Sequence, residues 1–192
     1  MMGPEVCCGW LPRYLGPHPS LAGVMIGRHF PTRWEEYAFA VESLDPLPRG
    51  VVIDAGTGFN PEIHNLPYIL GNLGWTVWAI DHDPRTMEMP SHPQVVRQVG
   101  DLTKLPYPDA SVDAYVSIST LEHLTELDRS SAISEAHRVL KPGGWLVLTA
   151  DWVAPLELGA VARCHDFDFV EEIPFHGERL DPHVAFLRTR KP

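Results

Sequence analysis

The chain has 192 residues, 44% of them hydrophobic and 21% charged, which is the size and balance of one globular domain with its own core. Its 25 acidic residues outnumber the 15 basic ones, and the net charge of −10 disfavours broad electrostatic binding to nucleic acid or to an anionic membrane. No signal-peptide pattern opens the chain, and no apolar run nears the roughly 18 residues of a membrane span. We therefore expect a cytoplasmic protein with no membrane insertion and no nucleic-acid partner.

The cysteines are Cys7, Cys8 and Cys164. Their spacing matches neither a metal-binding motif nor a paired disulfide framework. Free thiols are therefore predicted, and no metal site is expected.

The beginning of the chain differs in composition from the rest. Residues 1–31 contain five prolines and five glycines without a sustained helical or strand period, which predicts an irregular N-terminal arm before a domain over 32–192. Residues 33–44 place apolar side chains at helical spacing. Thr32 is positioned to cap this helix, and Pro46 follows its expected end.

From residue 50 onward, short apolar runs alternate with longer helical segments. Several runs are apolar throughout, as are the strands of a parallel sheet that helices cover on both faces. The expected strands are 51–54, 76–81, 95–99, 113–118 and 145–150, with helices at 67–73 and 128–140 and a final hairpin near 167–173 and 184–190. The Lys141-Pro142-Gly143-Gly144 segment is expected to end the second of these helices, with a glycine in a left-handed cap.

This order of elements predicts an α/β fold: a doubly wound, mostly parallel seven-stranded sheet with a C-terminal antiparallel hairpin. Such sheets bind their ligands at the carboxyl ends of the strands. Residues that directly follow the predicted strands are therefore the candidates for function.

Three acidic residues follow three successive predicted strands. Asp54 precedes Gly56 and Gly58, whose backbones can turn tightly and lie against a ligand. Asp81 is placed to receive the hydroxyls of a ribose. Asp101, with the backbone N–H of the residue after it, is suited to bind an adenine edge.

Each acid also has a plain structural alternative. Asp54 can belong to an ordinary tight turn, Asp81 can be a solvated loop acid beside His82, and Asp101 can cap the turn that follows it. The combination of all three predicts a crevice shaped for a nucleoside. A triphosphate is not expected, because the chain has no phosphate-binding loop of the G-x-x-x-x-G-K-[ST] type.

Four stretches of this region together resemble the class I S-adenosyl-L-methionine (SAM)-dependent methyltransferases, and within them the small type-11-like group. The stretches are VVIDAGTGFN, VWAIDHDP, GDLTKLPYPDASVDAYVSISTLEHL and AHRVLKPGGWLVLT, in family order between residues 50 and 150. The resemblance implies a Rossmann-like methyltransferase fold, SAM as co-substrate and a small-molecule acceptor.

The resemblance also implies where the cofactor lies. The glycine turn would run along its methionine part, Asp81 would hold the ribose, Asp101 would bind the adenine, and Ser119 would lie near the sulfonium. The full set of predicted cofactor contacts is Asp54, Ala55, Gly56, Gly58, Asp81, His82, Asp101, Leu102 and Ser119. The helix before the first strand would cover the cofactor, with contacts from Trp34, Glu36 and Tyr37.

The chain departs from the family pattern in the segment after the glycine turn. The third glycine position of the usual D-x-G-x-G-x-G turn is Asn60, and Pro61 follows it. About four extra residues extend the loop over 59–66, which we expect to lie against the methionine end of the cofactor.

Methyl transfer from a sulfonium is an in-line displacement, so the protein chiefly positions the acceptor and excludes water. A base is needed only when the acceptor must lose a proton. His123 and Asp151 are the candidate catalytic residues, because both follow strands that end at the crevice. His64 and His165 are further candidates.

Three other functions use a related fold. A methyltransferase-like protein can bind SAM, or keep only the fold, and act as a regulatory or partner subunit. Aminopropyl transfer from decarboxylated SAM uses the same crevice. A NAD-dependent dehydrogenase would require a glycine where the chain has Pro61. The sequence assigns neither the methyl acceptor nor the oligomeric state.

Overall fold

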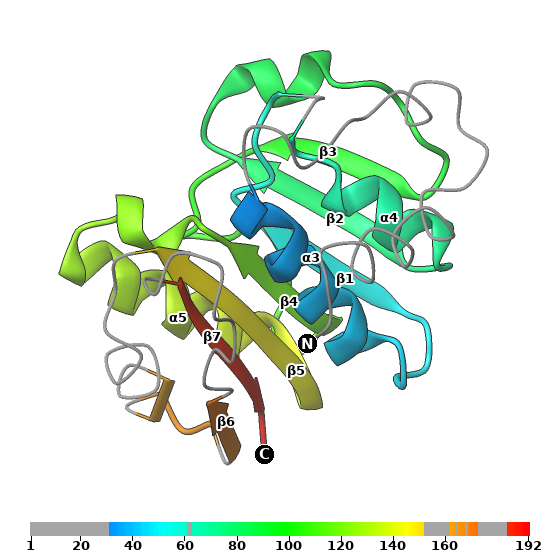
Figure 1. Cartoon of the computed structure of the whole chain (residues 1–192). Helices are drawn as coiled ribbons and strands as arrows, with labels where there is room; N and C mark the ends of the chain where they lie inside the picture. Colours follow the sequence, from blue (N-terminus) through cyan, green and yellow to red (C-terminus); the bar gives the residue numbers. More distant parts are fainter. Residues whose placement is uncertain (1–30, 61–62, 152–161, 164, 168, 173–183) are drawn as a thin grey trace.

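The computed structural model describes residues 31–60, 63–151, 162–163, 165–167, 169–172 and 184–192. These residues form one seven-stranded sheet in the order β3-β2-β1-β4-β5-β7-β6 (Figure 1). The strands are β1 (Val51–Ala55), β2 (Thr76–Asp81), β3 (Val95–Val99), β4 (Val112–Ile118), β5 (Leu140–Asp151), β6 (Phe169–Glu172) and β7 (Val184–Arg190).

Strands β1 to β5 pair in parallel, and β7 runs antiparallel to both β5 and β6. The predicted doubly wound, mostly parallel sheet with a C-terminal antiparallel hairpin is therefore confirmed. The chain order reverses beside β1, because β2 and β3 lie on one side of it and β4 and β5 on the other. This reversal opens a crevice at the carboxyl ends of β1 and β4.

Helices cover both faces of the sheet (Figure 1). Helices α3 (Pro31–Leu44) and α4 (Leu66–Asn72) share one apolar cluster with alternate residues of the central strands, including Val52 and Val116. Helix α5 (Glu126–Val139) shares the opposite cluster with residues of the other register, including Ile53. Successive strand residues point to opposite faces, so the apolar runs of β1 and β4 serve both cores.

The starts of α3 and α5 each lie two residues before the predicted ones, and α4 starts one residue early, at Leu66. Helix α3 begins at Pro31, so Thr32 lies inside its first turn and the predicted cap at Thr32 is wrong. Proline suits this first position because a helix's first N–H groups have no partner within the helix. Helix α5 begins at Glu126, where the hydroxyl of Thr125 accepts the N–H of Asp128 at 3.2 Å as its cap. The predicted arm over 1–31 lies, apart from Pro31, outside the described residues.

The glycine pair after α5 has a different role from the predicted helix cap. Helix α5 ends at Val139, and β5 starts at the next residue. Residues 141–144 form an irregularity inside β5, because its register with β4 shifts there. Gly143 has a φ of 80° and donates its N–H to the carbonyl of Lys191 at 2.9 Å. The left-handed glycine therefore bends a strand against the C-terminal residues and does not close a helix.

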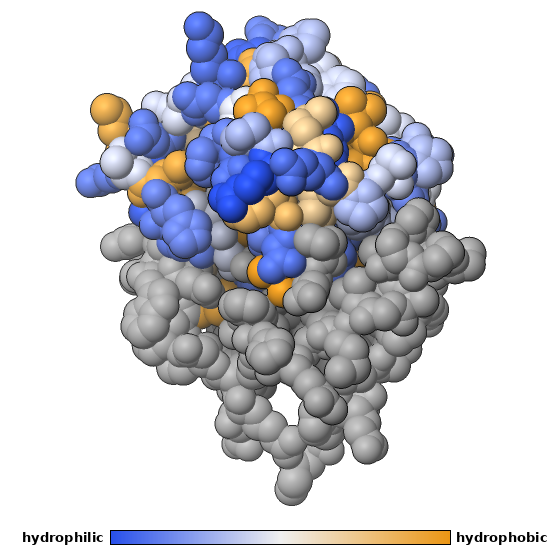
Figure 2. Space-filling view, turned by 90° about the horizontal axis from the view of Figure 1, so that it is seen from above, coloured by the Kyte–Doolittle hydropathy of each residue, from blue (hydrophilic) through white to orange (hydrophobic). Residues whose placement is uncertain are grey.

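Two short 3₁₀ helices complete the described elements, η1 (Pro84–Glu88) and η2 (Leu121–His123). Figure 2 looks down on the molecule from above, where apolar and hydrophilic side chains are interspersed. The large apolar side chains most exposed in the described part of the chain include Met87 of η1 and Val96 and Val99 of β3. No helix in that part of the chain has the length and apolar character that a bilayer crossing requires.

Candidate functional site

The three predicted acids lie at one edge of the sheet. Asp54 is the fourth residue of β1, Asp81 ends the neighbouring β2, and Asp101 follows β3 on the far side of β2. Asp54 and Asp81 are buried, with 3% and 7% of their surface exposed, whereas Asp101 is exposed. Burying two carboxylates is costly unless each is held by donors, so their partners define the site.

Asp81 organises the glycine turn that follows β1. One of its oxygens accepts the backbone N–H of Gly58 at 2.8 Å, and the other accepts the N–H of Asp83 at 2.9 Å. The turn itself is held to β2 because Gly56 donates its N–H to the carbonyl of Ile80 at 2.8 Å. The Asp81 carboxylate is thereby fixed in one orientation, with lone pairs remaining for a ligand hydroxyl.

Gly56 and Gly58 have φ values of 76° and 71°, which side chains rarely adopt. The space beside each glycine is occupied by protein. A Cβ on Gly56 would lie 2.3 Å from the side chain of Thr120, and one on Gly58 would lie 2.1 Å from Nδ1 of His64. Because Gly56 and Gly58 have no side chains, the side chains of Thr120 and His64 can approach their backbone closely.

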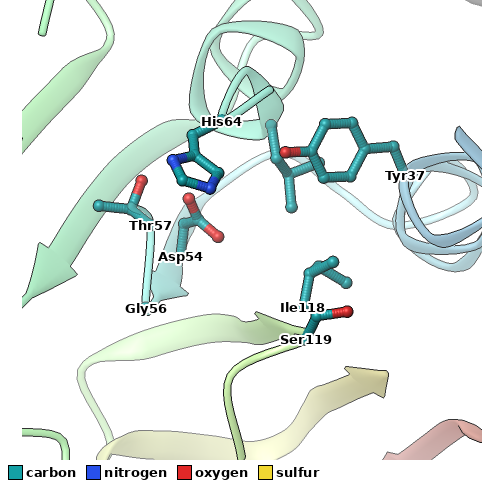
Figure 3. Close-up of a pocket in the computed structure, with 8 residues that line it drawn as sticks. Tyr37, Asp54, Gly56, Thr57, His64, Ile118 and Ser119 are labelled. Atoms are coloured by element: carbon teal, nitrogen blue, oxygen red, sulfur yellow. The ribbon is translucent and has the colours of Figure 1, made fainter. Parts of the chain in front are cut away.

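A pocket opens between this turn, the end of β4, helix α3 and the loop before α4 (Figure 3). It is lined by Tyr37, Asp54, Gly56, Thr57, His64, Leu66, Ile118 and Ser119. Within the described residues, the buried Thr57 hydroxyl and both amide atoms of Asn65, which lies between the lining residues His64 and Leu66 in the chain, have no hydrogen-bond partner. Buried polar atoms are almost always paired, so these atoms indicate where polar ligand groups or water fit.

The side of the pocket opposite the glycine turn contains a buried hydrogen-bond cluster. Glu36 of α3 is 1% exposed, and its Oε1 accepts hydrogen bonds from the hydroxyls of Ser119 and Thr149. The backbone N–H of Ser119 also contacts the Thr149 hydroxyl at 3.2 Å, and Ser119 has a φ of 44°. The cluster ties α3 to the ends of β4 and β5 beside the pocket.

Helix α3 is held to the extended loop as well. The hydroxyl of Tyr37 donates to the carbonyl of Ile63 at 2.6 Å. Tyr37 therefore lines the pocket and joins α3 to the loop beside it. The contacts of Glu36 and Tyr37 with a cofactor stay a prediction. The side chain of Trp34 lies outside the described residues.

The remaining predicted cofactor contacts occupy different surroundings. Asp101 accepts the N–H and the hydroxyl of Thr103 at 2.8 and 2.7 Å, and these bonds hold the pKa of its carboxyl below the usual value. It thus caps its turn while staying exposed to solvent. Leu102 is buried, and the side chain of His82 is 91% exposed with its Nδ1 3.2 Å from Asp81.

The candidate catalytic residues lie in different parts of the structure. His123 ends η2 and is absent from the pocket lining. Asp151 is the last residue of β5, and its side chain lies outside the described residues. His165 contacts the hydroxyl of Ser130 at 3.1 Å on the opposite face, beside α5. His64, from the extended loop, is the histidine that does line the pocket.

Sequence reasoning missed the pocket-lining residues Thr57, Leu66 and Ile118, and two buried residues next to the lining, Thr149 and Asn65. Thr149 was read only as part of a strand, because its hydroxyl partner Glu36 is 113 residues away in the chain. Asn65 lies two residues before Pro67, where the sequence indicates an ordinary helix start. The sequence contains one signal for the buried cluster: Glu36 lies on the apolar side of an otherwise amphipathic helix.

Comparison with known proteins shows the family to which the chain is related. The family model described as a methyltransferase domain matches residues 53–148, which is half of the chain. The ubiquinone/menaquinone biosynthesis C-methyltransferase UbiE of Caulobacter sp. (strain K31) is 37% identical over 148 residues, covering 71% of this chain and 57% of that protein. The Arabidopsis thaliana tRNA (carboxymethyluridine(34)-5-O)-methyltransferase is 35% identical over 135 residues, covering 69% and 32%.

Solved structures show the same fold. A putative methyltransferase in complex with the Haloferax volcanii Trm112 activator has a TM-score of 0.65 at 17% identity, over 89% of this chain and 96% of that one. The chain spans from a third to just over half of the length of the two curated relatives above. The matched family region contains the end of β1, the glycine turn, Asp81 and Asp101. The chain belongs to the methyltransferase-domain family of SAM-dependent methyltransferases.

Proposed function

We propose that the chain binds SAM at the carboxyl edge of β1, β2 and β4 and catalyses transfer of its methyl group to a small-molecule acceptor. The observation that carries the proposal is the Asp81 carboxylate, which is buried at the end of β2, beside the glycine turn that follows β1, and accepts the N–H of Gly58 at 2.8 Å. An acid held at this point is suited to receive two ribose hydroxyls. The unpartnered Thr57 hydroxyl supports the fit of a polar amino-acid end nearby.

The residues have separate proposed roles. Asp54, Ala55, Gly56 and Gly58 border the methionine part, Asp81 and His82 the ribose, Asp101 and Leu102 the adenine, and Ser119 the sulfonium. When bound, SAM supplies an already activated methyl group. The protein then has to orient the acceptor in line with the sulfonium and keep water away, which is the role of α3 over the pocket.

A small-molecule acceptor fits the charge of the chain. The net charge of −10 disfavours an RNA substrate such as the one the Arabidopsis relative's name describes. A quinone-biosynthesis intermediate, as in the name of the Caulobacter relative, carries no such requirement for basic surface. A cytoplasmic location is part of the same proposal. Proton removal by His123 or Asp151 is required only if the acceptor is a hydroxyl or a similar acid.

Two measurements test the proposal. Isothermal titration calorimetry should show SAM and S-adenosylhomocysteine binding with dissociation constants in the micromolar range. A screen for S-adenosylhomocysteine release over hydroxyl, amine and carbon acceptors should then identify the acceptor class. Absence of binding by folded protein would contradict the proposal. Binding without turnover on any acceptor would support the alternative of a regulatory or partner subunit.

A further inference from the structure

Strand β3 lies at one end of the sheet and has an open edge. Among the described strands it pairs with β2 alone, in a parallel register without a break. On the β3 side this ladder runs from the carbonyl of Gln94 to the N–H of Gly100, which bond to β2 at 2.7 and 2.9 Å. Every second residue of a strand bonds to the same neighbour, so the N–H and C=O groups of Arg97 and Val99 point away from β2.

Apolar side chains are exposed on both faces of this edge. The described residues between β3 and β4 form turns and no helix, so they leave the α5 side of β3 with little cover. Val96 is 57% exposed there, beside its register partner Trp78. Val99, on the other face, is 43% exposed, and Met87 of η1 is 55% exposed. Figure 2 views the molecule from above β3, the uppermost strand of Figure 1, and shows apolar side chains among hydrophilic ones.

Arg97, in the middle of the strand, is a half-buried cation held by neutral groups. Its guanidinium donates to the hydroxyl of Tyr68 at 2.9 Å and to that of Thr86 at 3.3 Å. Within the described residues no carboxylate pairs with it, whereas Arg85 of η1 pairs with Asp83 at 2.6 Å. Each terminal nitrogen of a guanidinium has two N–H groups, so Arg97 keeps donors for an anion that its own chain does not provide.

The edge lacks the features that usually prevent strand addition. Proteins protect open edges with lysine, proline or a bulge. Strand β3 contains neither lysine nor proline, and its register with β2 shows no bulge. The charge of Arg97 does not block the edge either, because its guanidinium lies over the sheet face, 5.2 Å from the centre of the Tyr68 ring. An added strand can therefore reach the outward backbone groups.

A second copy of β3 does not complement this edge. The strand contains no acidic residue, and symmetrical antiparallel pairing about Arg97 places two guanidinium groups opposite each other. A complementary strand instead has a carboxylate opposite Arg97. Apolar residues on either side of that carboxylate meet Val96 and Val99, because successive side chains of a strand point to alternate faces.

We propose that the open edge of β3 binds an extended segment of a partner protein, which adds a strand to the sheet and places one carboxylate against Arg97 between apolar side chains. The outward backbone groups of Arg97 and Val99 provide the main-chain hydrogen bonds, and the ion pair sets the register. The edge shares no residue with the lining of the pocket. The inference therefore does not depend on the proposed function.

The test is an NMR titration of the whole, isotope-labelled chain with two synthetic peptides. Both peptides alternate threonine and valine, and they differ only in a central glutamate or lysine. We expect the glutamate peptide to bind with a dissociation constant of about 1 mM or below and to protect the amides of Arg97 and Val99 from hydrogen exchange. The lysine peptide should bind at least about tenfold more weakly, since it brings a like charge to the guanidinium.

Three variants separate strand addition from unspecific adhesion. Arg97→Met keeps a long side chain beside Tyr68 but removes the charge, so the two peptides should bind it within about twofold of each other. Val99→Pro removes an outward N–H and should weaken the glutamate peptide at least about fivefold, whereas Val99→Thr keeps that N–H and should not. Leu127→Thr is the control for exposed apolar surface elsewhere, because Leu127 of α5 is 77% exposed, and it should leave binding unchanged.

Equal affinity of the unsubstituted chain for the two peptides, or no binding of either, would overturn the inference. Full binding by folded Val99→Pro would show that the peptide does not pair with the edge; if that variant does not fold, the comparison on Arg97→Met decides. Dimerisation of the chain that buries the β3 amides would assign the edge to a second copy and also overturn the inference. Peptide binding as expected in a chain that does not bind SAM would uphold the inference and contradict the proposed function.

Discussion

The two edges of the sheet each contain a buried or half-buried aspartate that accepts a backbone N–H, and they use it differently. At the amino edge, Asp113 accepts the N–H of Val51 at 2.8 Å and forms an ion pair with Lys141 at 2.7 Å. At the carboxyl edge, Asp81 accepts the N–H groups of Gly58 and Asp83, and the side chain beside it is the 91% exposed imidazole of His82.

The partners of the two aspartates distinguish a structural acid from a candidate binding acid. The charge of Asp113 is neutralised by a lysine of the same protein, so this aspartate joins β1, β4 and β5 and has little left for a ligand. The charge of Asp81 is held by neutral N–H dipoles, which orient it without neutralising it. The carboxyl edge therefore keeps an anionic acceptor for a ligand, whereas the amino edge is complete in itself.

Glycines at the two edges give the largest expected contrast. Gly58→Ala combines a φ of 71° with a Cβ only 2.1 Å from the ring of His64. We expect it to lower the free energy of unfolding by about 1–3 kcal/mol and to abolish measurable SAM binding, because His64 and the turn must both shift. Thermal unfolding and calorimetry measure the two effects.

Gly143→Ala is the matched control for that substitution, with a φ of 80° at the amino edge. It should lower stability by a similar amount of about 1–3 kcal/mol and leave the SAM affinity within twofold. Loss of SAM binding in both variants would show that backbone strain anywhere in the sheet disturbs the site, and the contrast between the edges would fail.

The two aspartates give the next largest effect. Asp81→Ala should weaken SAM and S-adenosylhomocysteine binding at least about tenfold, since it removes the ribose acceptor and the acceptor of the Gly58 N–H. Asp113→Ala leaves Lys141 and the Val51 N–H without their partner, so it should reduce the free energy of unfolding by about 1–3 kcal/mol with little change in affinity. Equal affinities for the two variants would contradict the assignment of Asp81.

The Glu36 cluster should show a smaller effect on binding than on stability. Glu36→Ala leaves the hydroxyls of Ser119 and Thr149 without their shared acceptor, which we expect to cost about 1–3 kcal/mol of unfolding free energy. SAM affinity should fall only severalfold, because the acid acts by holding α3 over the pocket. Hydrogen exchange of α3 amides would measure the loosening, and unchanged protection would refute this role.

The smallest expected effect concerns pH and belongs to the amino edge. Arg138, near the end of α5, donates to Glu135 and to the carbonyls of Leu105 and Tyr107. Its hydrogen bond to Glu135 holds the pKa of that carboxyl below the reference value of 4.5. A lowered carboxyl pKa contributes stability that is present above about pH 4.5 and is lost as the pH falls through the folded-state pKa.

Arg138→Met should therefore lower the free energy of unfolding by roughly 1 kcal/mol at pH 7, and the difference from the unsubstituted chain should shrink below pH 4. Urea unfolding across this pH range measures the change. SAM affinity at pH 7 should be unaffected, since the cluster lies away from the pocket. A pH-independent difference would show that Arg138 acts through its carbonyl contacts alone.

Local sequence was enough to place the elements that depend on neighbouring residues. Strands β2, β3 and β7 have the predicted bounds, because runs of β-branched and other apolar residues ending in Asp, Gly or Pro carry their own local signal. The acid and glycine turn after β1 was also readable, since a parallel sheet always brings the residues after its strands to one edge. The same local reading misplaced Gly143, because whether a glycine ends a helix or bends a strand depends on what packs beside it.

Which side chains meet at the pocket depends on contacts between segments that are far apart in the chain. Glu36 and Ser119 are 83 residues apart, and their contact requires α3 to lie across the ends of β4 and β5. His64 reaches the space beside Gly58 because the loop doubles back on Asn60, which no period in the sequence indicates. Local order follows from residues a few positions apart, whereas the chemistry of the pocket arises from long-range packing of helix, loop and sheet.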